Sequence, residues 1–226
     1  MKQTKSGKFI VIEGASDGIG KTTQFNLLKD RLKSDGFHVS SHHFPTYYSY
    51  QGKSVEKYLA GEYGKPSELS PYFINNLYAN DRAITWYTKL QPLYQKGHTL
   101  LLDRYTTSSL IYQSTFIENL AEKTTFLNYI VDYEYNKLGI KKPDQVIFLY
   151  APLEIINQLR QQRTGNPGIV NDIHERDLEL LKEVYANSIF VAKYFNWTMI
   201  NCANSQNGIR TPEDIHAEIY QNLHLG

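Results

Sequence analysis

Apolar and polar residues follow one another along this chain in blocks of two kinds. Short runs of β-branched and large apolar residues have the length of buried strands, as in KFIVI at 8–12. Such runs predict strands over 8–12, 99–103, 144–150 and 197–201, and a further strand is expected over 38–44, closed by Pro45.

The longer stretches between these runs repeat apolar residues at helical spacing. Over 22–34, for example, Phe25, Leu28 and Leu32 share one face. The same reasoning predicts helices over 71–95, 108–116, 121–138, 153–163, 173–194 and 212–223. Thr211 is expected to cap the last of these.

Alternating strands and helices predict an α/β fold with a parallel sheet covered by helices on both faces. The sequence has no internal repeat, no low-complexity tract and no linker, so we expect one domain over 1–226. Ligands of such sheets bind at the carboxyl ends of the strands. The charged motifs of this chain fall at those ends.

Composition narrows the possible partners. The 226 residues carry a formal net charge of +1, which favours neither a nucleic acid nor a membrane surface as partner. No apolar run approaches the roughly 20 residues of a membrane-spanning helix, and the N-terminus lacks a signal-peptide pattern. Cys202 is the single cysteine, which excludes an internal disulfide, and it is expected to be a small core residue. We therefore expect a soluble cytoplasmic protein.

The turn after the first predicted strand resembles a phosphate-binding loop. GASDGIGKTT at 14–23 has the Gly-Lys-Thr ending of that motif, between a strand and a helix. Backbone N–H groups at Gly18, Gly20, Lys21 and Thr22 would face phosphate oxygens, Lys21 would neutralise them, and Thr22 would hold Mg²⁺. The motif's first glycine should be residue 15, which is alanine here. We expect the loop to begin one residue early, with Gly14 taking the turn.

Three further motifs carry charge. In TLLLDRYTTS, Asp103 ends a strand as a metal-linked carboxylate does in phosphoryl-transfer enzymes, and Arg104 follows it; a solvated strand-end pair is the alternative. In LYANDR, Tyr78 and Arg82 share a helical face that suits a planar base, although a surface Tyr–Arg pair would have the same spacing.

The third of these motifs is LRQQRTGNPG. Its two arginines, Arg160 and Arg163, share a helical face and run into a Gly-Pro loop, which suits a charged mobile lid over about 160–172. The alternative is a polar helix end, where arginines are favoured by the helix dipole.

Taken together, these motifs resemble the thymidylate kinase family of P-loop nucleoside monophosphate kinases. The resemblance runs in family order through FIVIEG…DGIGKTTQ, HFPTYYS, LYANDRA, LLLDRYTTSSLIYQ, PDQVIFLYAPLEIINQLRQQR and NDIHERDLELLKEVY. It is nearest to the bacterial-type branch with glycine inside the loop. It implies a three-layer P-loop NTPase fold with a five-stranded parallel sheet and a mobile lid. It also implies ATP- and Mg²⁺-dependent phosphorylation of dTMP to dTDP for dTTP synthesis, and a homodimer through the helices around 71–95 and 108–116.

The resemblance also implies individual roles. On the dTMP side, Asp17 matches the carboxylate for the 3′-hydroxyl and Pro45 the proline before the acceptor site, which is cis in some proteins. Tyr78 would stack on thymine, Arg82 would reach the base and the phosphate, and Arg104 would bind the phosphate. Ser108 and Gln113 match the base pocket, and Tyr112 matches the ring that excludes ribonucleotides.

On the ATP side, the resemblance implies that the loop residues bind the phosphates, namely Gly18, Gly20, Lys21, Thr22 and Thr23. Arg160 would lie beside adenine, and Arg163 would contact the transferring phosphoryl group.

Two departures from the family pattern stand out. The loop is one residue longer before Asp17, and Tyr47 occupies a position where many members have arginine. One phosphate contact is therefore lost or is replaced by a hydroxyl.

The chemistry requires no general base, because the second pKa of the acceptor phosphate is about 6 and its oxygen is already ionised. Lys21, Mg²⁺, Arg104 and Arg163 would neutralise the charge that the reaction brings together. Two other functions stay open at this point. A thymidine kinase would need Glu13 or Asp17 as base, and a non-catalytic nucleotide sensor would need no acceptor pocket.

Overall fold

The computed structural model describes residues 7–16, 18–163, 178–206 and 208–225, and its centre is a five-stranded parallel sheet. The strands are β1 (Phe9–Gly14), β2 (Val39–His43), β3 (Thr99–Asp103), β4 (Gln145–Tyr150) and β5 (Thr198–Asn201). Their order is β2-β3-β1-β4-β5, and all four pairings are parallel. The predicted α/β fold with five parallel strands is confirmed.

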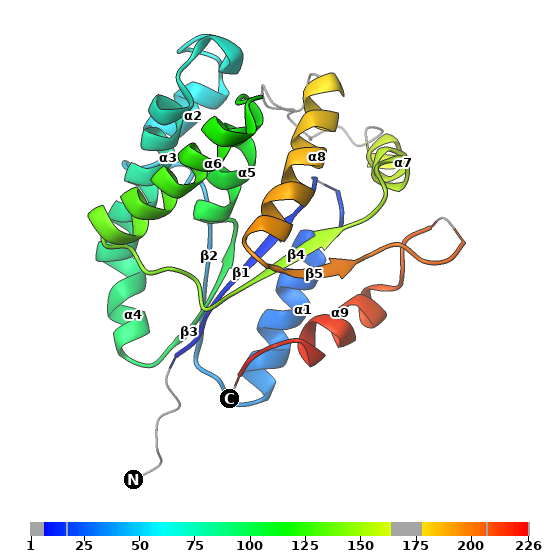
Figure 1. Ribbon diagram of the computed structural model, residues 1–226. Coiled ribbons are helices and arrows are strands. Elements are labelled where there is room, and N and C mark those ends of the chain that lie inside the picture. Colours follow the sequence, from blue (N-terminus) through cyan, green and yellow to red (C-terminus); the bar gives the residue numbers. More distant parts are fainter. Residues whose placement is uncertain (1–6, 17, 164–177, 207, 226) are drawn as a thin grey trace.

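Alternate residues of β1 enter the two faces of the sheet. Ile10 and Ile12 join a core with Leu28 and Leu32. That face is covered by α1 (Lys21–Ser34) and α9 (Pro212–Gln221), as Figure 1 shows. Complete burial of each such side chain contributes about 1.5–3 kcal/mol to the stability of the fold. Because side chains alternate between the two faces of a strand, burial of these residues also fixes the face that every other residue of the strand takes.

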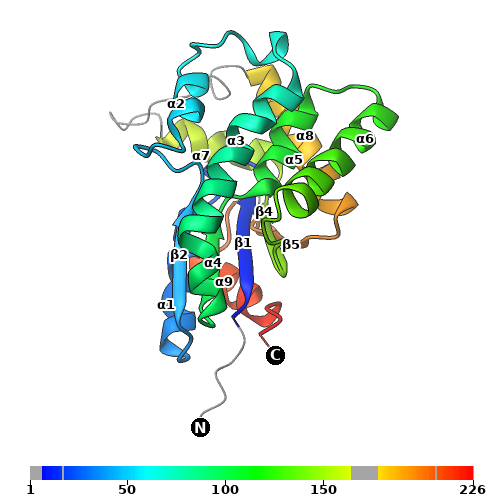
Figure 2. The same cartoon turned by 90° about the vertical axis from the view of Figure 1, so that its left-hand side faces the viewer.

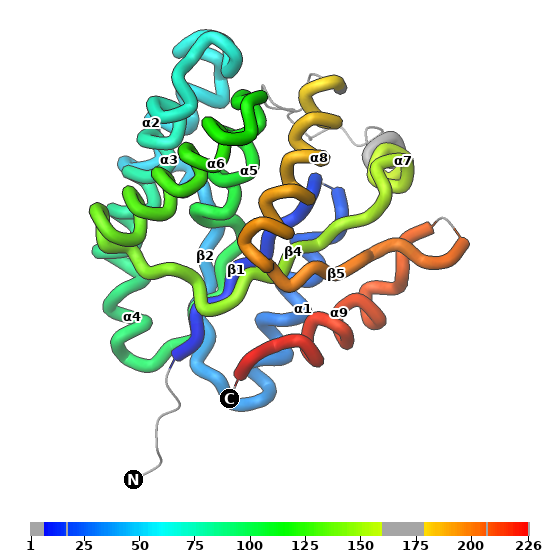
Figure 3. The backbone as a smooth tube through the Cα atoms, viewed as in Figure 1, coloured from blue at the N-terminus to red at the C-terminus, as the bar shows by residue number. Residues whose placement is uncertain are grey.

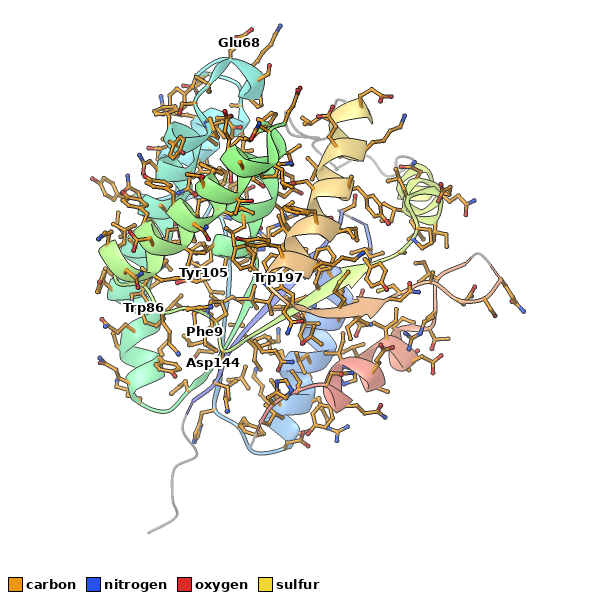
Figure 4. All side chains as sticks on the ribbon, viewed as in Figure 1. Phe9, Glu68, Trp86, Tyr105, Asp144 and Trp197 are labelled. Atoms are coloured by element: carbon orange, nitrogen blue, oxygen red, sulfur yellow. The ribbon has the colours of Figure 1, made fainter. Side chains whose placement is uncertain are left out.

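Phe9 and Val11 point to the opposite face. There Phe9 stacks on Trp86 with ring centroids 6.0 Å apart, and it meets Tyr105 edge-on at 5.1 Å. Figure 4 labels these three rings, which lie on one side of the sheet. The helices over this face are α3 (Pro71–Thr85), α5 (Thr106–Thr115), α6 (Leu120–Val131) and α8 (Leu178–Tyr194).

The predicted helix over 71–95 is continuous but not α-helical throughout. A π-helical segment η2 (Trp86–Leu90) lies between α3 and α4 (Gln91–Gln95), and a second such segment η3 (Asp132–Lys137) follows α6. Pro92 has no N–H to donate and its ring crowds the carbonyl four residues earlier. The π-helical segment, whose turns are wider than those of an α-helix, ends at Leu90, two residues before Pro92.

Other helix bounds also differ from the sequence prediction. The helix predicted from 108 begins two residues earlier, at Thr106. Helix α2 (Lys53–Leu59) and the 3-10 turn η1 (Pro66–Glu68) were not predicted, whereas α7 (Leu153–Arg163) has the predicted bounds. Thr211 caps α9, because its hydroxyl accepts from Asp214 N at 3.2 Å. The tube in Figure 3 follows the connection from β4 through α7.

Cys202 lies in the core, where burial raises the pKa of its thiol to about 12. It is therefore the inert core residue that the sequence predicts. No helix among the described residues is both long enough and apolar enough to cross a membrane.

Candidate active site

The carboxyl ends of three adjacent strands meet at one cleft. Asp103 ends β3, and the sheet register places it beside Ile12 of β1 and His43 of β2. The cleft encloses about 310 Å³, and α2 and the amino end of α8 lie at the same end of the molecule (Figures 1 and 2). This is where a parallel α/β sheet binds ligands.

Most of the site residues predicted from the sequence line this cleft. They are Lys21, Thr22, Pro45, Tyr78, Arg82, Asp103, Arg104, Ser108, Tyr112 and Gln113. Gly18, Gly20 and Thr23 lie close by, in the loop and the first turn of α1. Asp17 and the side chains of Arg160 and Arg163 lie outside the part of the chain that the structure describes.

The loop after β1 turns at its later glycines. Gly18 and Gly20 have φ values of 95° and 90°, a conformation that residues with a Cβ rarely adopt. Gly14 is instead the last residue of β1, and a Cβ there would lie 3.0 Å from Ile19 Cγ2. The expectation that Gly14 takes the turn is therefore wrong: Gly14 belongs to the strand, and a side chain there would crowd Ile19. Ala15 is not among the residues with positive φ, so the alanine causes no strain of that kind.

Helix α1 begins after a glycine, which has no side chain with which to cap it. Gly20 has a left-handed conformation, none of the described side chains caps the amino end of the helix, and its first turn holds no acidic residue. Orphan N–H groups and the positive end of the helix dipole are therefore available to an anion.

Lys21 and Asp103 form a buried ion pair at the floor of the cleft. The distance from Lys21 Nζ to Asp103 Oδ1 is 2.7 Å, and the side chains are 10% and 11% exposed. His43 Nδ1 lies 3.1 Å from the other carboxylate oxygen. Burial alone would raise the pKa of Asp103, but the hydrogen bond from His43 and the charge of Lys21 outweigh it. The pKa of this carboxyl lies well below its ordinary value, so Asp103 is ionised at neutral pH, and it is not a solvated strand-end residue.

Arg104 is turned into the cleft by an unusual backbone. Its φ is 66°, and its N–H donates to Ile12 O at 3.1 Å. A left-handed residue with a Cβ costs about 1–2 kcal/mol, and such strain is concentrated at functional sites. The guanidinium lies 3.7 Å from the buried carboxylate of Glu13 and 5.7 Å from the centroid of the Tyr112 ring.

Arg82 is buried in the cleft wall, with 2% of the residue exposed. It forms a bidentate ion pair with Glu134: Nε donates to Oε2 at 2.7 Å and Nη2 to Oε1 at 2.6 Å. The alternative of a surface Tyr–Arg pair is therefore wrong. Burial alone would lower the pKa of Arg82, but the charge of Glu134 outweighs it, so the pKa is raised and Arg82 stays cationic.

The remaining side of the cleft is aromatic and neutral. Tyr78 packs edge-on against Tyr58 at 6.1 Å, and Tyr47 stacks with His43 at 6.3 Å. Gln113 is 2% exposed, and its Oε1 has no hydrogen-bond partner among the described residues. Such a buried acceptor is costly unless a ligand satisfies it. The Phe44–Pro45 peptide bond is cis, in agreement with the resemblance.

Sequence reasoning missed several residues of this region. His43 and Ser109 line the cleft, and Glu134 holds Arg82 from outside it. The position of His43 at the end of a predicted strand could have identified it, because strand ends share one edge. Glu134 is 52 residues from Arg82 and carries no local signal. The contact between Glu13 and Arg104 likewise joins two different strand ends and has no signal in either motif.

Comparison with known proteins agrees with this geometry. Residues 12–219 match the family model described as Thymidylate kinase. A probable thymidylate kinase of Thermococcus gammatolerans is 31% identical over 219 residues, which cover 94% of each chain. A thymidylate kinase of Plasmodium falciparum is 30% identical over 221 residues, covering 97% of this chain and 90% of the relative.

A solved structure is similar to the fold as a whole. It is that of a thymidylate kinase from Candida albicans, with a TM-score of 0.69 and 22% sequence identity. The match covers 96% of this chain and 90% of the other. At this level of identity, the likeness supports the three-layer P-loop NTPase architecture. The assignment to a bacterial-type branch stays a prediction.

Proposed function

From the premise that this chain belongs to the thymidylate kinase family, enzymes that phosphorylate dTMP to dTDP, we propose that the transfer from ATP takes place in the cleft at Asp103. The observation that carries the proposal is the convergence of Lys21, Arg82 and Arg104 on one cleft of a chain whose net charge is only +1. Two polyanions can meet there because the cations are fixed in position before they arrive.

The acceptor nucleotide would lie with its base between Tyr78, Arg82, Ser108 and Gln113. Tyr78 offers a stacking surface. Gln113 Oε1, which accepts from no group in the described ranges, offers an acceptor to a ring N–H. Arg104 would bind the phosphate, and Tyr112, beside Arg104, would face the sugar. Asp17 would hold the 3′-hydroxyl, and Pro45 would border the site. Tyr47 stands where many members have an arginine, so its hydroxyl would replace one phosphate contact.

The donor ATP would place its phosphates on the loop. Backbone N–H groups of Gly18, Gly20, Lys21, Thr22 and Thr23 would bind their oxygens, and Lys21 would shift from Asp103 toward them. Arg160 would lie beside adenine, and Arg163 would reach the transferring phosphoryl group from a lid over about 160–172.

Thr22 and Asp103 would hold Mg²⁺ together with the phosphates. A hydroxyl and an ionised carboxylate are both oxygen ligands of the kind Mg²⁺ takes, and that ion is usually bound by one or two carboxylates plus substrate phosphates. When bound, the ion would neutralise charge on the phosphate oxygens.

No residue needs to act as a general base. The acceptor phosphate oxygen is ionised near neutral pH, and the roles left to the protein are alignment and charge neutralisation.

The surroundings of Glu13 weaken the alternative of a thymidine kinase in which Glu13 is the base. The Glu13 carboxylate accepts from Thr107 Oγ1 at 2.9 Å, Ser108 Oγ at 2.5 Å and Gly14 N at 3.1 Å, and it does not line the cleft.

We further propose a homodimer. Helix α3 and the segment η2 expose four large apolar side chains, namely Tyr72, Phe73, Ile84 and Tyr87, each between 37% and 49% exposed. Large apolar side chains exposed along one helical stretch are candidates for contact with a second copy of the chain, so we place the interface there. Helix α5 is mostly buried against its own chain, so the proposed interface is restricted to the α3 side. One domain over 1–226 and a cytoplasmic location stay predictions from the sequence.

A substrate panel tests this function. The chain is incubated with ATP, Mg²⁺ and one acceptor at a time, namely dTMP, dUMP, dCMP or thymidine, and the nucleotide products are separated by chromatography. Rapid conversion of dTMP to dTDP with little product from thymidine is expected. Phosphorylation of thymidine at a rate equal to or above that of dTMP would contradict the proposal and favour the thymidine kinase.

A further inference from the structure

Of the arginines whose side chains the structure describes, two line the cleft, and the protein holds them in different ways. Arg104 lies 3.7 Å from Glu13, whose carboxylate is also bound by the hydroxyls of Thr107 and Ser108. Arg82 instead has a carboxylate bound along one edge of its guanidinium, at 2.6 and 2.7 Å. The partner is Glu134, which is 0% exposed and lies in the π-helical segment η3. Nothing in the proposed reaction uses Glu134.

The first turn of α5 completes the arrangement around Glu134. Thr106 Oγ1 donates to Glu134 Oε2 at 2.8 Å, and Arg82 Nη2 donates to Ser109 Oγ at 2.8 Å. A bidentate pair with these extra hydrogen bonds fixes both the position and the plane of the guanidinium. Its Nε and Nη2 hydrogens are thereby used within the protein.

The Nη1 group is the part of the Arg82 guanidinium that the protein holds least tightly. Among the described residues, its hydrogen-bond partner is Tyr105 O at a long 3.5 Å. Arg82 lines the cleft although it is almost fully buried. A ligand in the cleft would therefore meet a single edge of a guanidinium whose charge is already matched by a carboxylate.

We propose that Glu134 is a positioning residue that commits Arg82 to a neutral carbonyl oxygen of the base and leaves the acceptor phosphate to Arg104. The inference rests on the proposed function. It also restricts the role that the resemblance gives Arg82, which combines the base and the phosphate. An arginine N–H can only donate a hydrogen bond, so a fixed Nη1 group distinguishes a carbonyl oxygen of the base from an amino group.

Discrimination between bases then depends on Glu134. A site built to hydrogen-bond one group rejects an analogue that cannot supply it. In dCMP an amino group replaces one of the ring carbonyls of dTMP, so two donors would face each other at Arg82. Because dCMP also lacks the methyl group and the ring N–H of dTMP, the hold on Arg82 is measured by how the ratio of kcat/KM for dTMP to that for dCMP changes between the wild type and a Glu134 variant.

The decisive variant is Glu134→Gln, which keeps the shape of the side chain and removes its charge. We expect the KM for dTMP to rise about 10-fold or more and the dTMP/dCMP ratio to fall about 10-fold, with kcat changed less than about 3-fold. The KM for ATP should stay within about 2-fold. The matched control is Glu218→Gln, which breaks the ion pair with Arg210 on the other face of the sheet and should leave both KM values unchanged.

The Glu134→Gln change leaves a buried arginine without its counter-charge, which can prevent folding. A second variant therefore keeps the inference testable in that case. The double variant Arg82→Met/Glu134→Gln removes both charges, and neutral replacements of buried ion pairs are usually tolerated. It should show the same KM defect as Arg82→Met alone, because two residues that act through one contact are not additive.

Several results would overturn the inference. One is a folded Glu134→Gln variant with wild-type KM for dTMP and a wild-type base ratio. Another is a Glu134→Gln variant whose kcat falls by the same factor as the KM values for dTMP and ATP rise. A third is a failure of both variants to fold. Either result would make the Arg82–Glu134 pair a purely structural contact. A wild-type chain that does not phosphorylate dTMP would instead overturn the proposed function itself.

Discussion

The Lys21 ammonium and the Asp103 carboxylate lie 2.7 Å apart at the floor of the cleft, and each belongs to a different proposed ligand. Lys21 is placed by the first turn of α1, and Asp103 by the last residue of β3. With no nucleotide present, each charge is matched by the other, which lowers the cost of burying both. Phosphates that enter the cleft would take over Lys21 and leave Asp103 for the metal.

Asp103→Asn should reduce kcat by about 100-fold or more, because it removes a negative charge from the metal site, with little change in the far-ultraviolet circular dichroism spectrum. A matched control is Asp144→Asn. Asp144 also pairs with a lysine and accepts from Phe9 N at 2.8 Å, but it precedes β4 at the opposite edge of the sheet. The control should lose stability and keep kcat. Equal kcat in the two variants would remove Asp103 from the proposed reaction.

We expect the folded protein to lose stability in mild acid because of His42. Burial, with a smaller effect from Lys89, lowers the pKa of His42 from 6.5 to about 4 in the folded chain. The folded state therefore binds this proton less tightly than the unfolded state. The contribution of His42 is full above pH 6.5 and is lost as the pH falls toward 4, by about 2 kcal/mol after allowance for solvent screening.

The measurement is urea unfolding at pH 7 and pH 4.5 for the wild type and for His42→Gln. Glutamine can still hydrogen-bond to Thr46, whose hydroxyl lies 3.0 Å from His42 Nε2. The variant should lose about 2 kcal/mol less than the wild type over this pH range. Parallel pH profiles would show that His42 does not carry the effect.

Tyr112 should control the choice between deoxyribonucleotides and ribonucleotides. Its ring is fixed beside Arg104, with Arg104 Nη1 3.5 Å from its hydroxyl. Tyr112→Ala should lower the ratio of kcat/KM for dTMP to that for its ribonucleotide counterpart by about 10-fold or more, because bulk is removed where a 2′-hydroxyl would enter. Tyr112→Phe, which keeps the ring, should retain the ratio. Loss of the ratio in both variants would assign the discrimination to the hydroxyl instead.

Arg163→Ala should lower kcat much more than it raises the KM for dTMP. The family resemblance puts Gly18 at the loop position where another branch has arginine, so we expect the lid to supply the charge on the transferring group. Removal of such an arginine typically costs about 10³-fold or more in rate. Arg160→Ala, on the same helix, should act mainly on the KM for ATP. Equal effects of Arg163→Ala on kcat and on the KM for dTMP would indicate a binding role.

The sequence predicted those parts of the fold that are encoded locally. Apolar runs located four of the five strands, and β2, whose sequence is largely polar, was predicted from the stretch that ends at Pro45. The strand-to-helix order was enough to place Lys21, Asp103 and Arg104 at one edge of the sheet. Gly18 and Gly20 take the backbone conformation for which glycine is used, although the role given to Gly14 was wrong.

The sequence could not show features that depend on distant partners. The π-helical turn at Trp86–Leu90 buries Trp86 and Leu90, which are four residues apart as they would be on one face of an α-helix, so the apolar pattern does not reveal the turn. Glu134 is a carboxylate in a polar stretch, and its burial becomes meaningful only when η3 is packed beside α3 and α5. The sequence could therefore not predict the ion pair of Arg82 with Glu134. It did identify the arginine itself, because Arg82 follows Tyr78 by four residues and shares its helical face.

Lys21 tests the account most directly. The formation of dTDP from dTMP and ATP with Mg²⁺ is followed for the wild type and for Lys21→Ala, with folding checked by thermal unfolding. We expect the variant to remain folded and to lose turnover by about 10³-fold or more, since the fixed charge on the phosphates is gone. A folded Lys21→Ala variant with wild-type turnover would contradict the claim that this cleft transfers the phosphoryl group by means of its fixed cations.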